Sequence, residues 1–443
     1  MAKVLLLGAG RSVGALVDYL QENALLLNLS LRIGDKDINK SQIMAEKFSG
    51  ASFFQFDISE DEGLDSEFRW ADLVISMLPS HLHGRVAHLC LHHSAHLITA
   101  SYCSPQIKNL DQQVKDKNLV FLTEMGLDPG IDHMSAMRAI DQLKKLGNKV
   151  VSFKSYVGGL IAVSKEKNPW NYKFTWNPRN VVKAGQGVVK FLKQGELKYL
   201  GYNSLFRRVE QLDIPELGSY EAYYNRDSLK YIDQYALGDC ATVIRGTLRN
   251  QGFCEAWDVF VQLGLTDDSF QMKTAGMSYR EFLNSFLRYH PSKSVEEKVL
   301  DFVGQDAAVF EKIEWLNLFS DQEKVELNVA SPAQVLQSVL ERKWKFSPED
   351  KDVVVMYHEI LFEKNNNVHR KQLSVCVYGD ESGDTAMAKT VGLPIGIATK
   401  LILKNRLLCS GVLIPVIQEI YEPVLSELKT YGIDFNECTS AME

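Results

Sequence analysis

The stretch Val4-Leu-Leu-Leu-Gly-Ala-Gly-Arg-Ser-Val-Gly14 decides the fold class of this 443-residue chain. Its apolar run predicts a buried parallel strand, and Ala15, Leu16, Tyr19 and Leu20 then repeat at helical spacing. A strand, a glycine turn and a helix begin a dinucleotide-binding fold, because the glycines let a pyrophosphate approach the helix N-terminus. The spacing is one residue longer than G-x-G-x-x-G, so a tight turn without a ligand is the alternative interpretation.

The same alternation of strand and helix continues to about residue 122. We expect strands at residues 4–7, 29–33, 53–56, 73–77, 96–99 and 119–122. Helices are expected between several of them, for example at residues 39–48 and 81–93. This alternation predicts an α/β domain with a parallel sheet, and such a sheet binds its ligands at the carboxyl ends of the strands.

Residues after these strands are the candidates for holding a nicotinamide dinucleotide. They are Gly8, Gly10, Arg11, Ser12, Val13, Asp35, Asp57, Ile58, Ser76, Met77 and Leu78. Asp35 follows the second strand, where an acid can bind the ribose hydroxyls and repel a 2′-phosphate. We therefore expect NAD, with NADP as the alternative because Arg11 and Lys36 lie close in sequence. Asp57 either flanks the adenine or caps a turn.

The stretch Glu124-Met-Gly-Leu-Asp-Pro-Gly-Ile-Asp-His133 follows the sixth expected strand. It holds two carboxylates, Asp128 and Asp132, around a Pro-Gly turn. Ser101 and Tyr102 follow the fifth expected strand, so both segments should lie at the ligand-binding edge. Asp132 and His133 are expected to cap the next helix.

Composition excludes several classes of protein. A net charge of −7 argues against nucleic acid as the partner. Seven cysteines without a C-x-x-C pair indicate reduced thiols, and the short apolar run at the start of the chain is unlike a signal peptide. The apolar segment 385–403 is interrupted by Gly392 and Pro394, so we expect it to pack on the first domain rather than span a membrane. We expect a cytoplasmic protein.

A histidine-rich helix at residues 81–93 is the one place where the sequence suggests a metal. His88 and His92 are four residues apart, which can put two ligands on one helix face. No acid or cysteine completes a zinc signature there, so we expect no metal site.

Beyond His133 the alternation of strand and helix ends. Expected elements are a strand at 150–157, a helical segment at about 260–345, a hairpin at 353–378 turning at 365–367, and a final helix at 415–431. The aromatic run Asn168–Trp176 is expected to form a sheet-face core, with a pocket wall as the alternative. Arginines in the segments 223–228 and 243–249 appear in polar, turn-like settings and could bind carboxylates.

The motifs resemble one family along nearly the whole chain, the glutamate-forming saccharopine dehydrogenases, also called saccharopine reductases. The matching segments are GAGRSVG, DLVISMLP, ITASYCSP, GLDPGIDHM, YVGGL, NPWNYKFTWNP, YNRDSLKY, IRGTLRNQGF, TAMAKTVGLP and GVLIPVIQEIYEPVLSELK. The resemblance implies three regions: a Rossmann domain at 1–130 completed by 385–443, an α+β substrate-binding and dimerisation domain at 131–260 and 346–384, and a helical subdomain at 261–345.

The resemblance also implies the reaction and its site. Such enzymes interconvert saccharopine and water with glutamate and α-aminoadipate semialdehyde, using a nicotinamide cofactor, and are expected to be homodimers. The implied substrate residues are Ser101, Tyr102, Asp128, Arg226, Arg245 and Thr247. Asp128 and Tyr102 are the candidates for proton transfer. Val157 stands where the family usually has cysteine, which either argues against an essential thiol or puts the substrate in question.

Two alternatives to a saccharopine dehydrogenase would need different residues at the substrate site. A dehydrogenase of the carboxynorspermidine type would reduce the imine of a diamine, and it would need an acidic subsite where Arg226 and Arg245 suggest a carboxylate site. A non-catalytic NAD-binding protein would not need Asp128, Tyr102 and both arginines.

Overall fold

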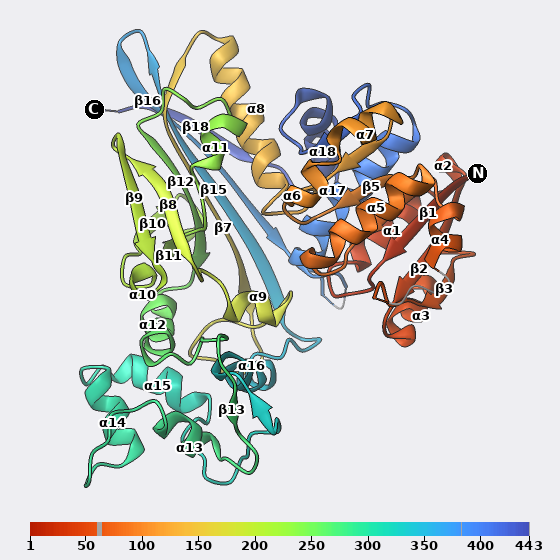
Figure 1. Cartoon of the computed structure of the whole chain (residues 1–443). Coiled ribbons are helices and arrows are strands. Elements are labelled where there is room, and N and C mark those ends of the chain that lie inside the picture. Colours follow the sequence, from red (N-terminus) through yellow and green to blue (C-terminus); the bar gives the residue numbers. More distant parts are fainter. Residues whose placement is uncertain (60–63, 382, 443) are drawn as a thin grey trace. The chain divides into compact units, whose positions relative to one another are not determined.

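The computed structural model describes residues 1–59, 64–381 and 383–442, which divide into two compact units (Figure 1). The first unit comprises Met1–Lys149 and Val377–Asn436, and the second comprises Val150–Cys376 and Glu437–Glu443. The first unit extends past the expected boundary at 130, because α8 (Ile131–Lys145) packs against α18 (Gln418–Thr430). The end of the chain, which we expected in the first unit, instead adds strand β18 (Asn436–Ala441) beside β16 (Asn367–Tyr378) in the second.

A parallel sheet forms the centre of the first unit. Within the described ranges it has seven strands in the order β17-β6-β5-β4-β1-β2-β3, and all neighbouring strands in it run parallel. The strands are β1 (Ala2–Leu7), β2 (Leu29–Asp35), β3 (Ser52–Gln55), β4 (Leu73–Ser76), β5 (His96–Thr99), β6 (Val120–Leu122) and β17 (Gly411–Leu413). All six predicted strands are confirmed, and the strand order reverses between β1 and β4, which opens a ligand crevice at their carboxyl ends.

Helices cover the sheet of the first unit. They include α1 (Gly14–Glu22), α3 (Ile38–Glu46), α4 (Leu64–Trp70), α5 (His83–His93), α7 (Asp111–Asp116) and α17 (Ala386–Leu403). As predicted, α17 packs on the first unit, against α1, and Figure 1 shows this C-terminal helix in the same unit as the N-terminal strands. By length and composition α17 could span a membrane, but 78% of it is buried within the fold. It is therefore explained as a core helix of this unit.

The second unit contains a large sheet with the strand path β10-β11-β12-β7-β15-β16-β18, and β8 and β9 extend from β12. The strands are β7 (Lys149–Val163), β8 (Val188–Lys193), β9 (Glu196–Gly201), β10 (Glu210–Ile214), β11 (Gly218–Tyr224), β12 (Thr242–Arg249), β15 (Lys351–Lys364) and β16. The predicted hairpin is confirmed as β15 and β16. The predicted strand at 150–157 is confirmed as part of β7.

The helical segment of the second unit shares one hydrophobic core with its sheet. The helices are α12 (Phe253–Leu263), α13 (Tyr279–Asn284), α14 (Val295–Phe302), α15 (Ala307–Trp315) and α16 (Pro332–Lys343). Trp170 is 1% exposed and packs against Trp257 and Trp344, so the aromatic run contributes to the core. Tyr172 also lines an open cavity of about 490 Å³ with Asn168 and Glu311. Residues 261–345, which we expected to form a separate helical subdomain, share this core and belong to the second unit.

Candidate active site

The glycine loop lies between β1 and α1, at the carboxyl edge of the first sheet. Gly8 has a φ of +96°, and a Cβ there would lie 2.9 Å from the Met77 carbonyl oxygen at the end of β4. A side chain is therefore excluded at this crossing. At Gly10 a Cβ would meet nothing within 4 Å, so this part of the loop faces open space. Arg11 is exposed and Val13 is buried. A backbone that is open at the start of a helix fits a pyrophosphate.

Asp35 lies beside this loop at the end of β2. Its Oδ2 accepts a hydrogen bond of 2.7 Å from the Ala9 N–H, and its Oδ1 accepts one of 2.9 Å from the Asp37 N–H. Two backbone donors thus hold the carboxylate next to the glycine loop. A carboxylate in this place can accept hydrogen bonds from ribose hydroxyls and repels a phosphate.

Asp57 and Ile58 follow β3. The Lys36 Nζ lies 2.8 Å from Asp57, and this partner lowers the pKa of Asp57 to about 2. Asp57 also accepts a hydrogen bond of 2.9 Å from the Ser59 N–H, so it stabilises a turn. Ile58 is buried in the hydrophobic core of the first unit. The turn interpretation of Asp57 is thus confirmed, and contact with the adenine stays a prediction.

The end of β4 holds Ser76, Met77 and Leu78. Ser76 is fully buried, and its Oγ lies 2.9 Å from Nδ1 of His83. Met77 approaches the glycine loop through its backbone, since its carbonyl oxygen faces Gly8. Leu78 is partly buried against the core of the unit.

Tyr102 and Asp128 are brought together by the loops after β5 and β6. The Tyr102 hydroxyl donates a hydrogen bond of 2.9 Å to Oδ1 of Asp128, and both side chains are half-buried. Ser101 precedes Tyr102 and is also half-buried. The pairing of a phenol with a carboxylate at a ligand-binding edge can orient a substrate and accept a proton.

Glu124 and His133 position this region, a role that the sequence did not reveal. Nε2 of His133 lies 2.8 Å from Oε2 of Glu124, and both side chains are buried. Oε1 of Glu124 accepts a hydrogen bond of 3.0 Å from the Cys103 N–H, which ties the loop after β6 to the loop after β5. A capping role of His133 stays a prediction, whereas Asp132 does accept a 2.6 Å hydrogen bond from the Gly130 N–H in the turn before α8. The sequence could not predict the pairing of Glu124 with His133, because no periodic pattern relates two residues on opposite sides of a turn.

The second unit carries the three remaining candidates. Arg226 follows β11, is exposed and has a φ of +43°. Arg245 is buried on β12, with its guanidinium carbon 4.2 Å from the centre of the Tyr231 ring, and Thr247 is half-buried on the same strand. The turn-like setting expected for residues 243–249 was wrong, because they belong to a central strand. The alternation of polar and apolar residues from 244 to 249 was the signal for it.

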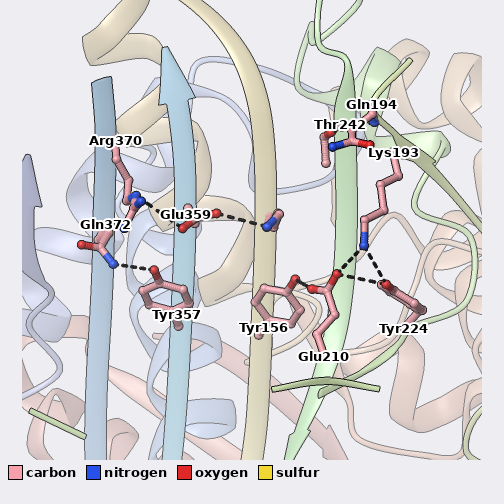
Figure 2. A network of polar contacts seen from close by, with 11 residues as sticks. Tyr156, Lys193, Gln194, Glu210, Tyr224, Thr242, Tyr357, Glu359, Arg370 and Gln372 are labelled. Atoms are coloured by element: carbon pink, nitrogen blue, oxygen red, sulfur yellow. Dashed lines mark hydrogen bonds and ion pairs between the residues drawn. The ribbon is translucent and has the colours of Figure 1, made fainter. Parts of the chain in front are cut away.

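A polar network occupies one face of the second sheet (Figure 2). Glu210 accepts hydrogen bonds from Tyr156, from Lys193 at 2.9 Å and from Tyr224 at 3.0 Å. Burial opposes ionisation of Glu210, but the bonds from Tyr156 and Lys193 outweigh it and lower its pKa. Tyr156 is in register with Gly246, so this network lies on the face opposite to Arg245 and Thr247. It supports the sheet rather than extending the candidate site.

His88 and His92 are both exposed on the histidine-rich helix α5. In the described part of the chain one group of three possible ligands includes His92: Asp65, His92 and His93, whose ligand atoms lie within 4.8 Å of one another. Asp65 is already 2.6 Å from Nε2 of His93 and 2.6 Å from a guanidinium nitrogen of Arg69. A surface ion-pair cluster accounts for this group.

Comparisons with known proteins agree with this arrangement. The saccharopine dehydrogenase NADP binding domain matches residues 4–122, and the saccharopine dehydrogenase C-terminal domain matches residues 126–433. Saccharopine dehydrogenase [NADP(+), L-glutamate-forming] of Saccharomyces cerevisiae is 32% identical over 99% of both chains. The solved apo structure of the glutamate-forming yeast enzyme covers all of both chains, with 31% identity and a TM-score of 0.88.

Two further similarities set the limits of this comparison. Mitochondrial alpha-aminoadipic semialdehyde synthase of Mus musculus is 34% identical over 98% of this chain, but this chain spans 47% of that protein, about half its length. A homospermidine synthase structure from Legionella pneumophila is 10% identical with a TM-score of 0.56, which shows a shared fold alone. With both domain matches and similarity along the full yeast enzyme, the chain belongs to the saccharopine dehydrogenase family.

Proposed function

We propose that this chain is a nicotinamide-dependent saccharopine dehydrogenase of lysine metabolism. It interconverts saccharopine, oxidised cofactor and water with L-glutamate, α-aminoadipate semialdehyde and reduced cofactor. The names of the yeast relative and of the solved yeast structure support this reaction. The observation that carries the proposal is the hydrogen bond between Tyr102 and Asp128, at the same sheet edge as the glycine loop.

The products define which bond is oxidised. Saccharopine is a secondary amine, and glutamate leaves with the nitrogen. The carbon that loses hydride is therefore the one that becomes the aldehyde, and water adds to the resulting C=N bond. The cofactor supplies the hydride acceptor. Asp128 accepts the proton of the amine while Tyr102 holds the carboxylate in place. Ser101, Arg226, Arg245 and Thr247 bind the carboxylates of the substrate.

The residues present fit a dinucleotide held by Gly8, Gly10, Arg11, Ser12 and Val13, with Asp35 on the ribose. We propose NAD as the preferred cofactor, although the yeast relative carries NADP in its name. The carboxylate of Asp35 would face a 2′-phosphate, and Lys36 is already paired with Asp57 at 2.8 Å. Because a carboxylate and a phosphate repel each other, Asp35 disfavours the phosphorylated cofactor.

We expect the purified chain to reduce NAD with saccharopine, followed as absorbance at 340 nm, and to show a kcat/KM at least tenfold lower with NADP. The reason is the carboxylate of Asp35 beside the ribose. Aldehyde formation is measured in parallel with an aldehyde-trapping reagent. Absence of reduced cofactor with both dinucleotides would remove the proposed reaction. A preference for NADP would remove only the role given to Asp35.

Arg226→Ala is expected to raise the KM for saccharopine roughly ten- to a hundredfold, because a charge-assisted hydrogen bond contributes about 1.5–3 kcal/mol. The dissociation constant of the cofactor should change less than twofold, since the proposed cofactor residues belong to the first unit. Steady-state kinetics and fluorescence titration with NADH measure the two effects. Arg208→Ala removes another exposed arginine of the second unit and should leave both unchanged. A weakened affinity for NADH in Arg226→Ala would show that this arginine is misplaced.

We also propose a homodimer in a reducing compartment, with the cytoplasm as the expected location. All seven cysteines lie in the described ranges as free thiols, which supports a reducing environment. The homodimer follows from the family resemblance, and light scattering of the purified chain tests it.

A further inference from the structure

His83 connects two strand ends of the first unit through its imidazole ring. It is the first residue of α5 and is 2% exposed. Its Nδ1 lies 2.9 Å from Ser76 Oγ at the end of β4. Its Nε2 lies 2.8 Å from Ser101 Oγ and 3.1 Å from Thr99 Oγ1, at the end of β5. The ring therefore joins a strand end next to the cofactor loop with a hydroxyl of the proposed substrate site.

The surroundings of His83 keep the ring neutral at physiological pH. Burial lowers its pKa to about 4, and the charge of His81 contributes in the same direction. A neutral imidazole has one nitrogen that donates a hydrogen bond and one that accepts. Which nitrogen donates decides the direction of every hydroxyl around the ring.

Buried hydroxyls lie at both nitrogens, Ser76 Oγ at Nδ1 and Thr99 Oγ1 at Nε2, so each tautomer gives one of the two hydroxyl hydrogens an acceptor. Among the described residues, Nδ1 of His83 is the one hydrogen-bond partner of the buried Ser76 hydroxyl. In one of the two tautomers the buried Ser76 hydroxyl donates to Nδ1, which gives its hydrogen an acceptor. Nε2 then carries the ring hydrogen. The Nε2 hydrogen can then be shared between the oxygens of Ser101 and Thr99, and the Ser101 oxygen is the nearer of the two.

We propose that His83 is a positioning residue that donates its Nε2 hydrogen to Ser101 Oγ and thereby turns the Ser101 hydroxyl hydrogen toward a substrate carboxylate. The inference rests on the proposed function, in which Ser101 contacts saccharopine. A serine hydroxyl can rotate, and a donor placed at its oxygen leaves the hydroxyl hydrogen for another acceptor. Because the ring is uncharged, it directs the hydroxyl without attracting the carboxylate itself.

A double-mutant cycle tests whether His83 acts through Ser101. Ser101→Ala and His83→Phe are each expected to raise the KM for saccharopine about tenfold, with kcat changed less than threefold. The double variant should raise KM no more than either single variant, because both remove the same interaction. Multiplication of the two effects to about a hundredfold, or a loss confined to kcat, would overturn the proposal.

Two matched variants distinguish loss of the hydrogen bond to Ser101 from a general folding defect of His83→Phe. His83→Gln retains an amide donor near the position of Nε2 and should restore KM to within threefold of the unmodified chain. His88→Gln changes an exposed histidine of the same helix and should leave KM unchanged. If His83→Gln has the KM of His83→Phe while both keep the unmodified melting temperature, hydrogen-bond donation to Ser101 is not the role of this ring.

A spectroscopic measurement separates failure of this inference from failure of the proposed function. In the full chain labelled with ¹⁵N-histidine, long-range ¹H–¹⁵N correlation at pH 7 should show His83 with a protonated Nε2 and an unprotonated Nδ1. The opposite tautomer or an imidazolium ring overturns the inference even when saccharopine is turned over. The expected tautomer in a chain that does not oxidise saccharopine overturns the substrate contact together with the proposed function.

Discussion

Asp128→Asn is expected to lower kcat for saccharopine oxidation about a hundredfold, the lower end of what a positioned general base contributes. The asparagine amide oxygen can still accept the 2.9 Å hydrogen bond from Tyr102, so the loop geometry should be retained. What the variant loses is a carboxylate that accepts the amine proton. Initial rates at 340 nm and the dissociation constant of NADH are the measurements, and the second should change less than twofold.

Asp116→Asn is the matched control for this variant. Asp116 is an exposed carboxylate on α7 of the same unit, and its replacement should leave kcat unchanged. A kcat within threefold of the unmodified chain in Asp128→Asn would mean that the substrate amine and solvent exchange the proton directly. The site would then work by orientation, and Asp128 would lose its proposed catalytic role.

Gly130→Ala is expected to have the largest effect on stability. Gly130 has a φ of +150°, and a Cβ there would lie 1.9 Å from the Gly126 carbonyl oxygen. Gly126 and Gly130 are held together by backbone pairing in the turn that carries Asp128, so neither can move without the other. Combining backbone strain with overpacking, we expect the free energy of unfolding to fall by roughly 3–5 kcal/mol.

Gly147→Ala separates the two contributions to that loss. Gly147 also has a positive φ, +76°, but a Cβ there meets nothing within 4 Å. Its replacement should cost about 1 kcal/mol through backbone strain alone. Urea unfolding followed by circular dichroism, with the transition of the first unit compared among the variants, measures both. Equal losses for the two variants would show that the turn around Gly126 relaxes to admit a side chain.

The sequence predicts the first unit well because its signals are local. Most of the predicted strands are short and largely apolar and lie next to a turn, and the buried strand β1 shows that pattern most clearly. Strand β17 was missed because three residues, Gly411–Leu413, are too few to show a period. The end of the chain was placed in the wrong unit because the pairing of β18 with β16 is a long-range contact.

In the candidate site, too, the sequence predicts residues with local signals and misses those that depend on long-range contacts. Tyr102 and Asp128 follow strand ends, so the sequence placed both at the correct edge, and the structure joins them. The groups that hold that edge in position, His83, Glu124 and His133, were not recognised as such. Their partners come from other loops, and a single sequence gives no measure of which distant hydroxyl or carboxylate each will meet.

The discontinuous make-up of the first unit has a consequence for biosynthesis. Thr123, next to β6, bonds to Leu413 of β17 across 290 positions of the chain, and α17, which covers α1, comes just before β17. The second unit also receives its last strand from the C-terminal end. Residues up to Leu413 must therefore leave the ribosome before the first sheet is complete, and residues up to Ala441 before the second is. Apolar surfaces of the nascent chain stay uncovered during that interval, when chaperones would bind them.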